Sequence, residues 1–399
     1  MKICFLNLGN YGSTGGIVRQ LADMVKSEGH KTLVVYPDSK KNKQARDDDY
    51  IMESECYQYI SGELSTFTGF DCCFALSATH KLLKKLDDFQ PDIIHLHNIH
   101  GWYVNILMLF RYIKRHNIRV VWTLHDCWAF TGHCPHFQEN NCEKWKTGCH
   151  SCELHMNYPK SYLDNSKWMY AIKKHCFTGV QNMMIVTPSE WLASLVKKSF
   201  LGCYPVQVIN NGINLLIFQP QNSDFKKRCN IEKKKVVLGV ASQWSNKKGL
   251  DVFIELSKRL PDNYQVVLVG TSEKTDAILP NKIISIHRTN NQKELAEIYA
   301  AADVFLNPTR EDTFPTVNIE ALACGTPVVT FDVGGSPEII DFNCGKVAPK
   351  DDIHSIQNAI LQICEDSKLY RQDCVMRSKK YSAEKRFQEY LFLYKKCGK

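Results

Sequence analysis

Short apolar runs rich in β-branched residues alternate with amphipathic helical stretches along the whole 399-residue chain. This alternation is typical of parallel α/β units, in which each helix crosses back over a sheet to reach the next strand. Eleven runs predict strands: 3–7, 32–36, 93–97, 120–124, 184–187, 206–209, 236–241, 265–270, 283–287, 304–307 and 328–331. We expect the first five to form one doubly wound sheet and the remaining six to form a second.

The length of the chain also favours two domains. With 399 residues, 44% of them hydrophobic, the chain is too long for one ordinary core. The best boundary lies at 202–205, where a helix rich in Lys and Leu ends and a strand begins without a long linker. We expect domains at 1–204 and 205–380, joined by a short hinge that lets them close on a ligand, and a final helical segment at 381–399.

Cysteine usage and hydropathy indicate where such a chain works. The 17 cysteines are odd in number, and most are scattered through strand-like and helix-like stretches, which argues for a reducing compartment. No window offers the eighteen or more apolar residues that cross a bilayer. The apolar run at the N-terminus is broken by Asn7, Gly9 and Asn10 before it could act as a signal peptide. We expect a cytoplasmic protein.

The charge distribution excludes one class of partner and leaves another open. The net charge of +8 divides evenly between the two halves, so no nucleic-acid-binding arm is indicated. Four helix-like segments of the first half nevertheless combine Lys or Arg with apolar neighbours: 82–85, 110–115, 168–174 and 192–200. Such faces could rest on anionic lipid at the inner face of the cell membrane, or be solvated faces with snorkelling lysines.

An acidic run interrupts the first half. Residues 38–49 are polar and predict a surface loop, which ends in the three consecutive acids Asp47, Asp48 and Asp49. Acidic clusters bind metals in some enzymes, but a block of like charge among Lys and Asn is usually solvated. We therefore expect this run to face solvent.

The segment 311–327 is the most informative of the chain. It follows the strand run 304–307 and predicts a loop and then a helix that opens near Thr316 and closes at Gly325. Open α/β sheets bind ligands where a helix starts at the carboxyl end of a parallel strand, and the free N–H groups there favour phosphate. Three carboxylates flank this start and either accept hydrogen bonds from sugar hydroxyls or cap the helix: Glu311, Asp312 and Glu320.

A second helix start follows the strand run 328–331. Gly335 and its preceding glycine let the backbone approach a ligand closely. Ser336 fits the N-cap of a helix, with Pro337 at its first position. Two adjacent helix starts could share one diphosphate.

A third loop follows the strand run 236–241 and carries Lys247 and Lys248. Either ammonium group could reach phosphate oxygens as a leaving group gains charge. Exposed loop lysines are common, so the pair gains meaning only from the two neighbouring loops.

Together these three loops resemble the donor site of the retaining GT-B glycosyltransferases of family 4, and the resemblance covers nearly the whole chain. It implies two Rossmann-like domains facing across a cleft, with the C-terminal helix returning to the first. It also implies that Glu320 binds the donor ribose and that Glu311 or Asp312 contacts the transferred sugar. The seven-residue separation of the family's two acids fits Asp312 and Glu320.

The chain departs from the family pattern at three positions. Gln243 stands where the family has an Arg five residues before its Lys-Gly, although Lys248 matches the lysine and Lys247 could replace the Arg. Asp312 stands where the family usually has Glu. Pro315 replaces the usual Gly and removes one N–H donor.

In the first half, Gly15 and Gly16 resemble the family's Gly-rich loop near the donor phosphates and the acceptor. His125, at the end of a strand run, resembles a histidine that faces the transferred sugar. Without the other motifs, a lone histidine at a strand end would be read as a structural residue.

A cysteine-rich insertion at 127–155 follows His125 and resembles a stretch found in a polysaccharide-assembly subgroup of the family. Four thiols within nineteen residues could bind structural zinc, remain free and buried, or act in redox chemistry. They are Cys134, Cys142, Cys149 and Cys152. Zinc is favoured over disulfides in a reducing compartment.

The resemblance implies retaining, metal-independent transfer of a hexose from a UDP- or GDP-linked donor, with no catalytic cofactor. The acceptor is expected to be a saccharide, lipid-linked, in surface polysaccharide synthesis. Lys248 and the helix starts at Thr316 and Ser336 would stabilise the departing diphosphate. Alternatives are an epimerase or phosphorylase of the same architecture, or a regulator with a degenerate site. A Rossmann dehydrogenase is excluded because no Gly-x-Gly-x-x-Gly follows the first strand run.

Overall fold

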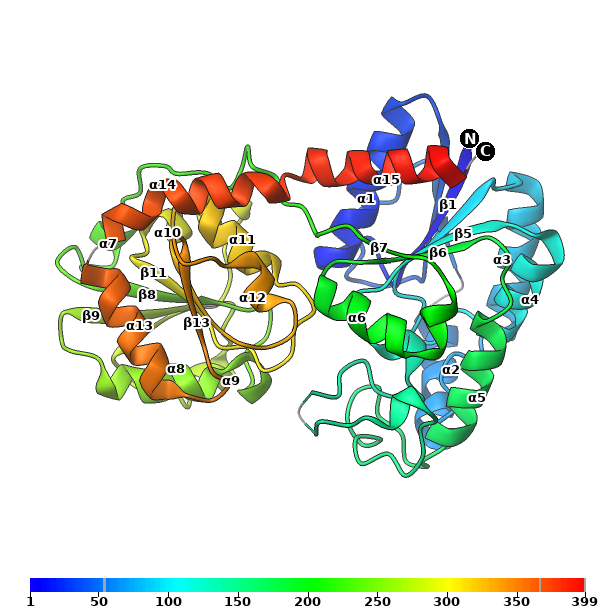
Figure 1. Cartoon of the computed structure of the whole chain (residues 1–399), viewed down its shortest axis with the longest axis horizontal. Coiled ribbons are helices and arrows are strands. Elements are labelled where there is room, and N and C mark those ends of the chain that lie inside the picture. Colours follow the sequence, from blue (N-terminus) through cyan, green and yellow to red (C-terminus); the bar gives the residue numbers. More distant parts are fainter. Residues whose placement is uncertain (53–54, 139, 366, 398–399) are drawn as a thin grey trace. The chain divides into compact units, whose positions relative to one another are not determined.

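The computed structural model describes residues 1–52, 55–138, 140–365 and 367–397, which divide into two compact units (Figure 1). Unit 1 comprises Met1–Ile209 and Phe387–Lys399, and unit 2 comprises Asn210–Arg386. The predicted segments 127–155 and 381–399 include residue 139 and residues 398–399, which lie outside the described residues.

Unit 1 is built on a parallel sheet in the order β3-β2-β1-β4-β5-β6-β7. Because the order reverses direction between β1 and β4, this point is the topological switch where open α/β sheets bind ligands. The strands are β1 (Lys2–Leu6), β2 (Lys31–Tyr36), β3 (Asp49–Ile51), β4 (Ile93–Leu96), β5 (Arg119–Thr123), β6 (Met183–Thr187) and β7 (Val206–Val208). The helices are α1 (Gly12–Ser27), α2 (Glu55–Thr68), α3 (Leu76–Phe89), α4 (Ile106–His116), α5 (Ser166–Phe177) and α6 (Glu190–Lys198), with single turns η1 (Trp128–Phe130), η2 (Lys144–Lys146) and η3 (Phe200–Cys203).

Unit 2 repeats this architecture with a parallel sheet in the order β10-β9-β8-β11-β12-β13. The strands are β8 (Lys235–Val240), β9 (Tyr264–Val269), β10 (Ile283–Ile286), β11 (Val304–Asn307), β12 (Val328–Phe331) and β13 (Gly345–Ala348). The helices are α7 (Phe225–Arg228), α8 (Leu250–Arg259), α9 (Glu273–Asp276), α10 (Gln292–Ala301), α11 (Thr316–Ala323), α12 (Ser336–Ile339), α13 (Ile353–Glu365) and α14 (Ser367–Ser378), with single turns η4 (Asn246–Lys248) and η5 (Lys379–Tyr381). The last helix, α15 (Ala383–Cys397), begins in unit 2 and belongs to unit 1 from Phe387 onward.

The central strands of both sheets are apolar along nearly their whole length because helices cover both of their faces. Phe5 of β1, Ile94 of β4 and Trp122 of β5 are buried in unit 1, as are Leu238 of β8 and Phe305 of β11 in unit 2. Burial of both faces fixes the strands, so contacts with a ligand must come from the loops at the strand ends.

The run 206–209, which sequence analysis assigns to the second half, forms β7 and pairs in parallel with β6 of the first sheet. Unit 1 therefore extends to Ile209 rather than ending at residue 204. The run is apolar enough for either sheet, and only its pairing partner decides which one it joins. Sequence analysis also missed β13, a short strand at the edge of the second sheet.

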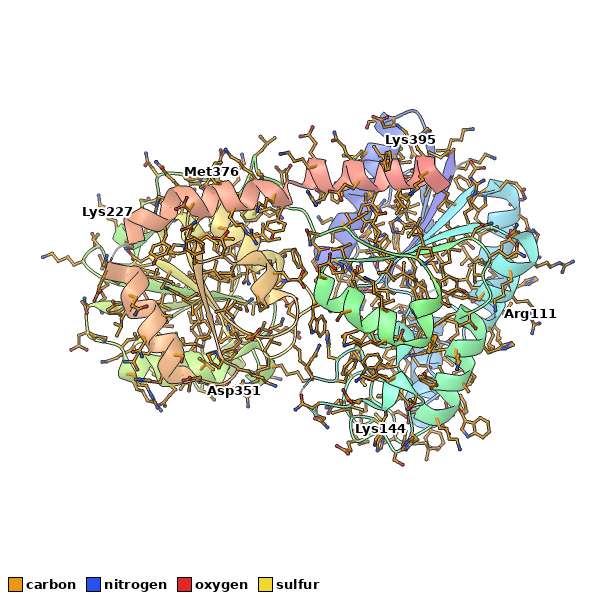
Figure 2. All side chains as sticks on the ribbon, in the orientation of Figure 1. Arg111, Lys144, Lys227, Asp351, Met376 and Lys395 are labelled. Carbon is orange, nitrogen blue, oxygen red and sulfur yellow. The ribbon has the colours of Figure 1, made fainter. Side chains whose placement is uncertain are left out.

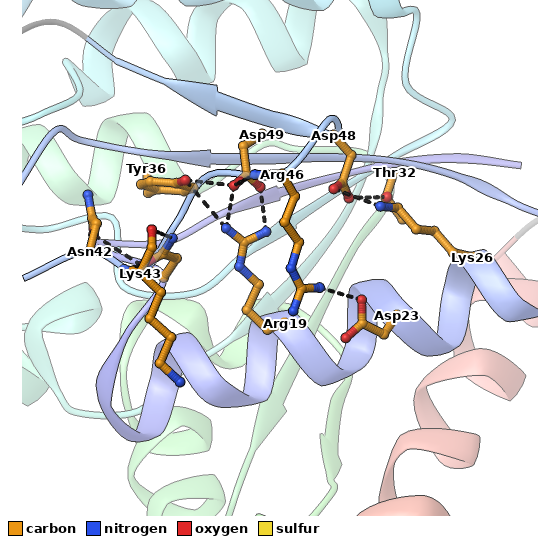
Figure 3. Close-up of polar contacts among 11 residues, drawn as sticks. Arg19, Asp23, Lys26, Thr32, Tyr36, Asn42, Lys43, Arg46, Asp48 and Asp49 are labelled. Carbon is orange, nitrogen blue, oxygen red and sulfur yellow. Dashed lines mark hydrogen bonds and ion pairs between the residues drawn. The ribbon is translucent and has the colours of Figure 1, made fainter.

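The expectation that the acidic run 47–49 is solvated is wrong for two of its three residues. Asp49 begins β3, and its carboxylate forms an ion pair with Arg19 of α1 (Figure 3). Asp48 pairs with Lys26, two α1 turns further along, at 2.7 Å. The cations that neutralise the run come from a helix distant in sequence, so local composition could not reveal them.

Helix α15 contributes side chains to the core of unit 1 from Phe387 onward. The hydroxyl of Tyr394 lies 2.6 Å from Nδ1 of His95 on β4, and the hydroxyl of Tyr390 lies 3.1 Å from Oγ1 of Thr123 on β5. The end of the chain is therefore a structural part of the first unit. Among the described helices, none has the length and apolar character needed to cross a bilayer.

Candidate functional site

Three loops of unit 2 leave the carboxyl ends of β8, β11 and β12, which are neighbours in one parallel sheet. Parallel neighbours end at the same edge, so the loops meet there. The backbone N–H of Arg310, after β11, donates to the carbonyl of Lys247, after β8, at 2.9 Å. The backbone N–H of Gly335, after β12, lies 3.3 Å from the carbonyl oxygen of Asp312, to which it donates.

Asp312 is the residue through which all three loops are linked. One oxygen of its carboxylate lies 3.0 Å from Nζ of Lys248. Its backbone carbonyl lies against Gly334, which has φ +59°, and a Cβ at that glycine would lie 1.8 Å from the oxygen. Only glycine fits there, for both steric and backbone reasons.

Glu311 forms a second ion pair, with Lys247 at 3.0 Å, but the Glu311 and Asp312 side chains differ in exposure. The side chain of Glu311 is 5% exposed, whereas that of Asp312 is 23% exposed. Both lysines remain more open than their partners, at 49% for Lys247 and 38% for Lys248. The structure therefore brings the four predicted charged residues together at one edge, with the cations outermost.

Arg310 is a member of this site that sequence analysis missed. Its guanidinium bonds both oxygens of Asp251 at 2.7 and 2.8 Å, lies 2.7 Å from Asp351 and donates to the carbonyl of Asn246. These bonds tie the β11 loop to the β8 loop and raise the pKa of Arg310. Its position directly before the acidic pair was the available signal.

Glu320 lies in α11, beyond the helix start at Thr316 that sequence analysis predicted. Burial raises the pKa of its carboxyl to about 7, while a hydrogen bond of 3.2 Å from the Tyr299 hydroxyl opposes the rise. No side chain caps the N-terminus of α11, where Pro315 occupies the cap position. The first-turn N–H groups of α11 therefore carry no side-chain cap bond and remain suited to an anion.

The second predicted helix start differs from expectation by one residue. Gly335, not Ser336, occupies the cap position of α12, a helix of four residues. The hydroxyl of Ser336 is buried and has no hydrogen-bond partner. Pro337 therefore takes the second position of α12 rather than the first.

In unit 1, His125 follows β5 at the sheet edge shared with β4. Its Nε2 lies 3.0 Å from Nδ1 of His97, which follows β4. Burial lowers the pKa of His125 to about 4 and that of His97 well below its usual value, so both rings are neutral at pH 7. Sequence analysis missed His97 and also His100, although His95, His97 and His100 crowd one strand end.

Gly15 and Gly16 of unit 1 differ in what surrounds them. Both residues lie in the first turns of α1, which follows the β1 loop. A Cβ at Gly15 would lie 2.7 Å from the backbone of Asn10, so this glycine lets the loop close onto the helix. Gly16 has only the end of the Gln20 side chain nearby, at 4.0 Å, and has no such packing reason.

Comparison with known families follows the division of the chain. Residues 15–215 match the family model described as Glycosyltransferase Family 4, and residues 221–381 match the one described as Glycosyl transferases group 1. The chain belongs to glycosyltransferase family 4. The second match contains the loops after β8, β11 and β12, and the first contains Gly15 and His125.

Two curated relatives of this family 4 chain are bacterial proteins. A protein named for colanic acid biosynthesis, the glycosyl transferase WcaC of Escherichia coli K12, is 25% identical over 66% of the chain and 65% of its own length. An α-1,3-N-acetylgalactosaminyltransferase of Campylobacter jejuni, named for a diphospho-undecaprenol substrate, is 30% identical over 40% of the chain and 44% of its own length. Neither match spans two thirds of the relative.

Solved structures with similar folds cover nearly the whole family 4 chain. A sucrose-phosphate synthase from Thermosynechococcus elongatus has a TM-score of 0.74 at 16% identity, over 99% of this chain and 98% of that one. Anabaena HepE in complex with UDP has a TM-score of 0.68 at 14% identity, over 99% and 100%. The fold is GT-B, with two Rossmann-like units.

The cysteine insertion of this family 4 chain encloses a cavity of about 240 Å³. All four predicted thiols line it, together with His133, whose buried Nε2 has no hydrogen-bond partner. A hydrogen bond from Cys134 lowers the pKa of Cys152 to about 7. As placed, the described residues include no group of three or more His, Cys, Asp or Glu side chains that could hold a metal ion.

Proposed function

We propose that this chain is a retaining glycosyltransferase that moves a hexose from a nucleoside diphosphate donor to a saccharide acceptor. The observation that carries the proposal is the cluster of two open lysines and two acids beside the uncapped start of α11. An anionic donor can displace Asp312 from Lys248 at little cost, since the exposed ammonium exchanges one anionic partner for another.

Lys248, Asp312 and Glu320 then have roles in the transfer. The acceptor hydroxyl oxygen bonds to the anomeric carbon, the bond from that carbon to the diphosphate breaks with its electron pair leaving on the phosphate, and the hydroxyl proton passes to the departing phosphate oxygen. Lys248 and the N–H groups at Thr316 stabilise the charge that develops there, the task a metal performs in other transferases. Asp312, more exposed than Glu311, contacts the transferred sugar. Glu320 accepts hydrogen bonds from the ribose hydroxyls.

Names of relatives support the choice of partners. HepE was solved with UDP, and the Campylobacter jejuni relative is named for a lipid-linked diphosphate substrate. WcaC is named for a polysaccharide pathway. We propose a UDP- or GDP-linked donor, a lipid-linked saccharide acceptor and a role in surface polysaccharide synthesis.

Thermal-shift measurement against UDP, GDP and their sugars tests the donor site. Bound nucleotide should raise the melting temperature by mass action, and Glu320→Ala should abolish that rise without lowering the melting temperature of the free protein. Turnover of the nucleotide sugar should disappear in the same variant. Binding without turnover under any acceptor would point instead to a regulator, and interconversion of the sugar without an acceptor to an epimerase.

A face of unit 1 supports contact with the membrane. Helix α2 buries its small residues Ser61, Gly62 and Ser65 and turns its large apolar ones outward, the reverse of an ordinary surface helix. The exposed side chains are Tyr59, Ile60, Leu64 and Phe67, each at least 44% exposed. Tyr162 and Leu163 extend this patch, because the backbone N–H of Tyr162 donates to the carbonyl of Thr66 at 2.8 Å.

Cations lie on the helices that follow α2. A groove of about 480 Å³ between α3 and α4 is lined by Lys84, Arg111 and Arg115, and Figure 2 shows Arg111 projecting outward. Exposed aromatic and aliphatic side chains with cations nearby suit an anionic bilayer surface. We propose that α2 and this groove rest on the inner face of the cell membrane.

Co-sedimentation with phosphatidylglycerol–phosphatidylethanolamine vesicles tests this contact. Ile60→Glu should lower the bound fraction at least fivefold because it places a charge in the acyl boundary. Met376→Glu, on α14 of unit 2 (Figure 2), is the matched control, since Met376 is 60% exposed against 52% for Ile60. Equal binding by both variants would contradict the proposal.

We also propose structural zinc in the thiol cavity. Four thiolates are the ligand set that tetrahedral zinc prefers, and His133 presents an unpartnered nitrogen to the same cavity. Binding would require the thiols to close in around the ion. Elemental analysis of the purified full chain should find one zinc per molecule, reduced by Cys142→Ala and unchanged by Cys203→Ala, which removes an exposed cysteine outside the cavity.

A further inference from the structure

An imidazole and a carboxylate at the ligand-binding edge of unit 1 form a pair that the donor chemistry does not use. Nε2 of His100, after β4, lies 2.9 Å from Oδ2 of Asp126, after β5. Their side chains are 10% and 15% exposed. The second carboxylate oxygen accepts a hydrogen bond from the backbone N–H of Trp128 at 2.9 Å, which fixes the orientation of Asp126.

Each partner favours the charged form of the other. Burial alone would lower the pKa of His100, but the Asp126 carboxylate outweighs it and raises that pKa. Burial would likewise raise the pKa of Asp126, and His100 holds it at about 2. Enclosing an ion pair costs desolvation that an apolar pair of the same size avoids, so stability does not explain its presence.

The loop that presents His100 is held in an unusual conformation. Gly101 has φ +111° and Trp102, a bulky residue, has φ +70°. The Trp102 ring packs on Gly62 of α2, where a Cβ would lie 2.8 Å from it, and the side chain of Gln58 donates to the Gly101 carbonyl at 2.8 Å. Such backbone strain persists where the surroundings enforce it and gathers at functional sites.

The side chain of Trp128, itself held by buried polar groups, packs against His100. The ring of Trp128 sits 5.4 Å from the ring of His100, and its Nε1 donates to Asp71 at 2.7 Å. Nζ of Lys173, wholly buried, lies 3.6 Å from the centre of the Trp128 ring and donates to the Trp128 carbonyl. Burial lowers the pKa of Lys173 to about 8, against the pull of Asp71. Packing against the Trp128 ring therefore restricts rotation of the His100 side chain.

The open side of the pair offers groups suited to a sugar. Nδ1 of His100 has no hydrogen-bond partner in the described part of the chain. The ring of Tyr158 stands edge-on to His100 at 6.5 Å and is 56% exposed. An aromatic ring beside polar groups binds a saccharide by packing on its C–H face and bonding its hydroxyls. The carboxylate of Asp126 disfavours a phosphate.

We propose that His100 and Asp126 bind a hydroxyl-bearing sugar of the acceptor, with the Tyr158 ring packed against it. The inference rests on the proposed transfer, and it assigns the acceptor's sugar, rather than its diphosphate, to this edge of unit 1. His100 then contacts the substrate directly, and Trp128 acts as its positioning residue.

Saturation-transfer NMR on the full chain tests this site without requiring turnover. The probes are p-nitrophenyl glycosides of glucose, galactose and N-acetylgalactosamine. His100→Gln and Asp126→Asn should raise the Kd of the bound glycoside at least tenfold, and Tyr158→Leu about fivefold. His354→Gln, an exposed histidine on α13 of unit 2, should leave it unchanged.

The outcomes separate this site from the donor site. Stabilisation by UDP should stay the same in all four variants, because they leave unit 2 intact or change only its exposed surface. The inference would be overturned if none of the glycosides binds the wild-type chain. It would also be overturned if Tyr158→Leu and His100→Gln each bind the glycoside as tightly as wild type does. Absence of both a UDP and a GDP effect in the wild type would instead overturn the proposed function and leave the glycoside result standing.

Discussion

Two acidic runs, 47–49 in unit 1 and 311–312 in unit 2, look alike in sequence and differ in what surrounds them. The first is enclosed: the side chain of Asp49 is 1% exposed and that of its partner Arg19 is 9% exposed. The second stays open, because the lysines that pair with it remain 38% and 49% exposed. An enclosed pair has no room for a further ligand, whereas an open pair can exchange its partner for one.

The two acidic runs also differ in the type of cation that pairs with them. Arg19 bonds both oxygens of Asp49, and the hydroxyl of Tyr36 donates to the same carboxylate at 2.7 Å. A planar, two-pronged arginine suits a permanent pair, while a lysine is a mobile point charge on a flexible stem. The comparison therefore assigns the first run to stability and the second to ligand binding, and each assignment can be tested against the other.

The largest effect is expected from Lys248→Met. Loss of the cation nearest the departing diphosphate should lower kcat by roughly 100- to 1,000-fold, as loss of one charge-stabilising group does in other enzymes. The melting temperature should hardly change, because the lysine is 38% exposed. Assays of nucleotide-sugar turnover measure the loss. A greater loss of kcat in Lys247→Met would assign the role of stabilising the departing diphosphate to Lys247, which pairs with Glu311.

Arg19→Met should lower stability and leave turnover nearly unchanged. Removing one partner of an enclosed ion pair leaves a buried carboxylate and should cost about 3 kcal/mol of unfolding free energy, measured by urea denaturation. Turnover per folded molecule should stay within twofold of wild type. A large loss of turnover at full stability would show that the first run also serves a ligand.

Glu320→Gln should remove a pH dependence of stability. The folded-state pKa of Glu320 is raised to about 7 from 4.5 because the carboxyl is buried. Its stabilising effect is therefore complete below pH 4.5 and is lost as the pH rises through 7, when the buried group must ionise. At pH 8 the variant should exceed wild type by about 3 kcal/mol, and at pH 4 the two should match. Parallel curves would contradict burial as the cause.

The smallest effect is expected from Arg46→Met, which breaks an ion pair with Asp23 on the surface of unit 1. Both side chains are about half exposed, at 46% and 53%. Solvent screens such pairs, so the loss should be about 0.5 kcal/mol or less in the same urea measurement. A cost near that of Arg19→Met would mean that exposure does not separate the two kinds of pair.

Much of the fold was predictable because its signals are local. The runs 304–307 and 328–331 coincide with β11 and β12, and the helix predicted to open near Thr316 and to close at Gly325 is α11. The edge strands β3 and β13 were missed, since short half-exposed strands lack the long apolar run of a central one.

The candidate site was predictable only in part. Lys248 and Asp312 were found because they follow strands that end at one sheet edge. Arg310 and His100 were missed because their importance lies in partners that are distant in sequence: Asp251 for the first and Asp126 for the second. A titratable side chain reveals little until its neighbours are known.

The sequence by itself determined the class of the fold and the positions of the loops that form the candidate site, because the periods of helix and strand, and the residues that end them, are set within a few neighbours. Tertiary structure decided which sheet β7 joins, which acids are sealed and which stay open, and how the histidines of unit 1 pair. Those outcomes depend on burial and charge between residues far apart along the chain, where no local pattern reaches.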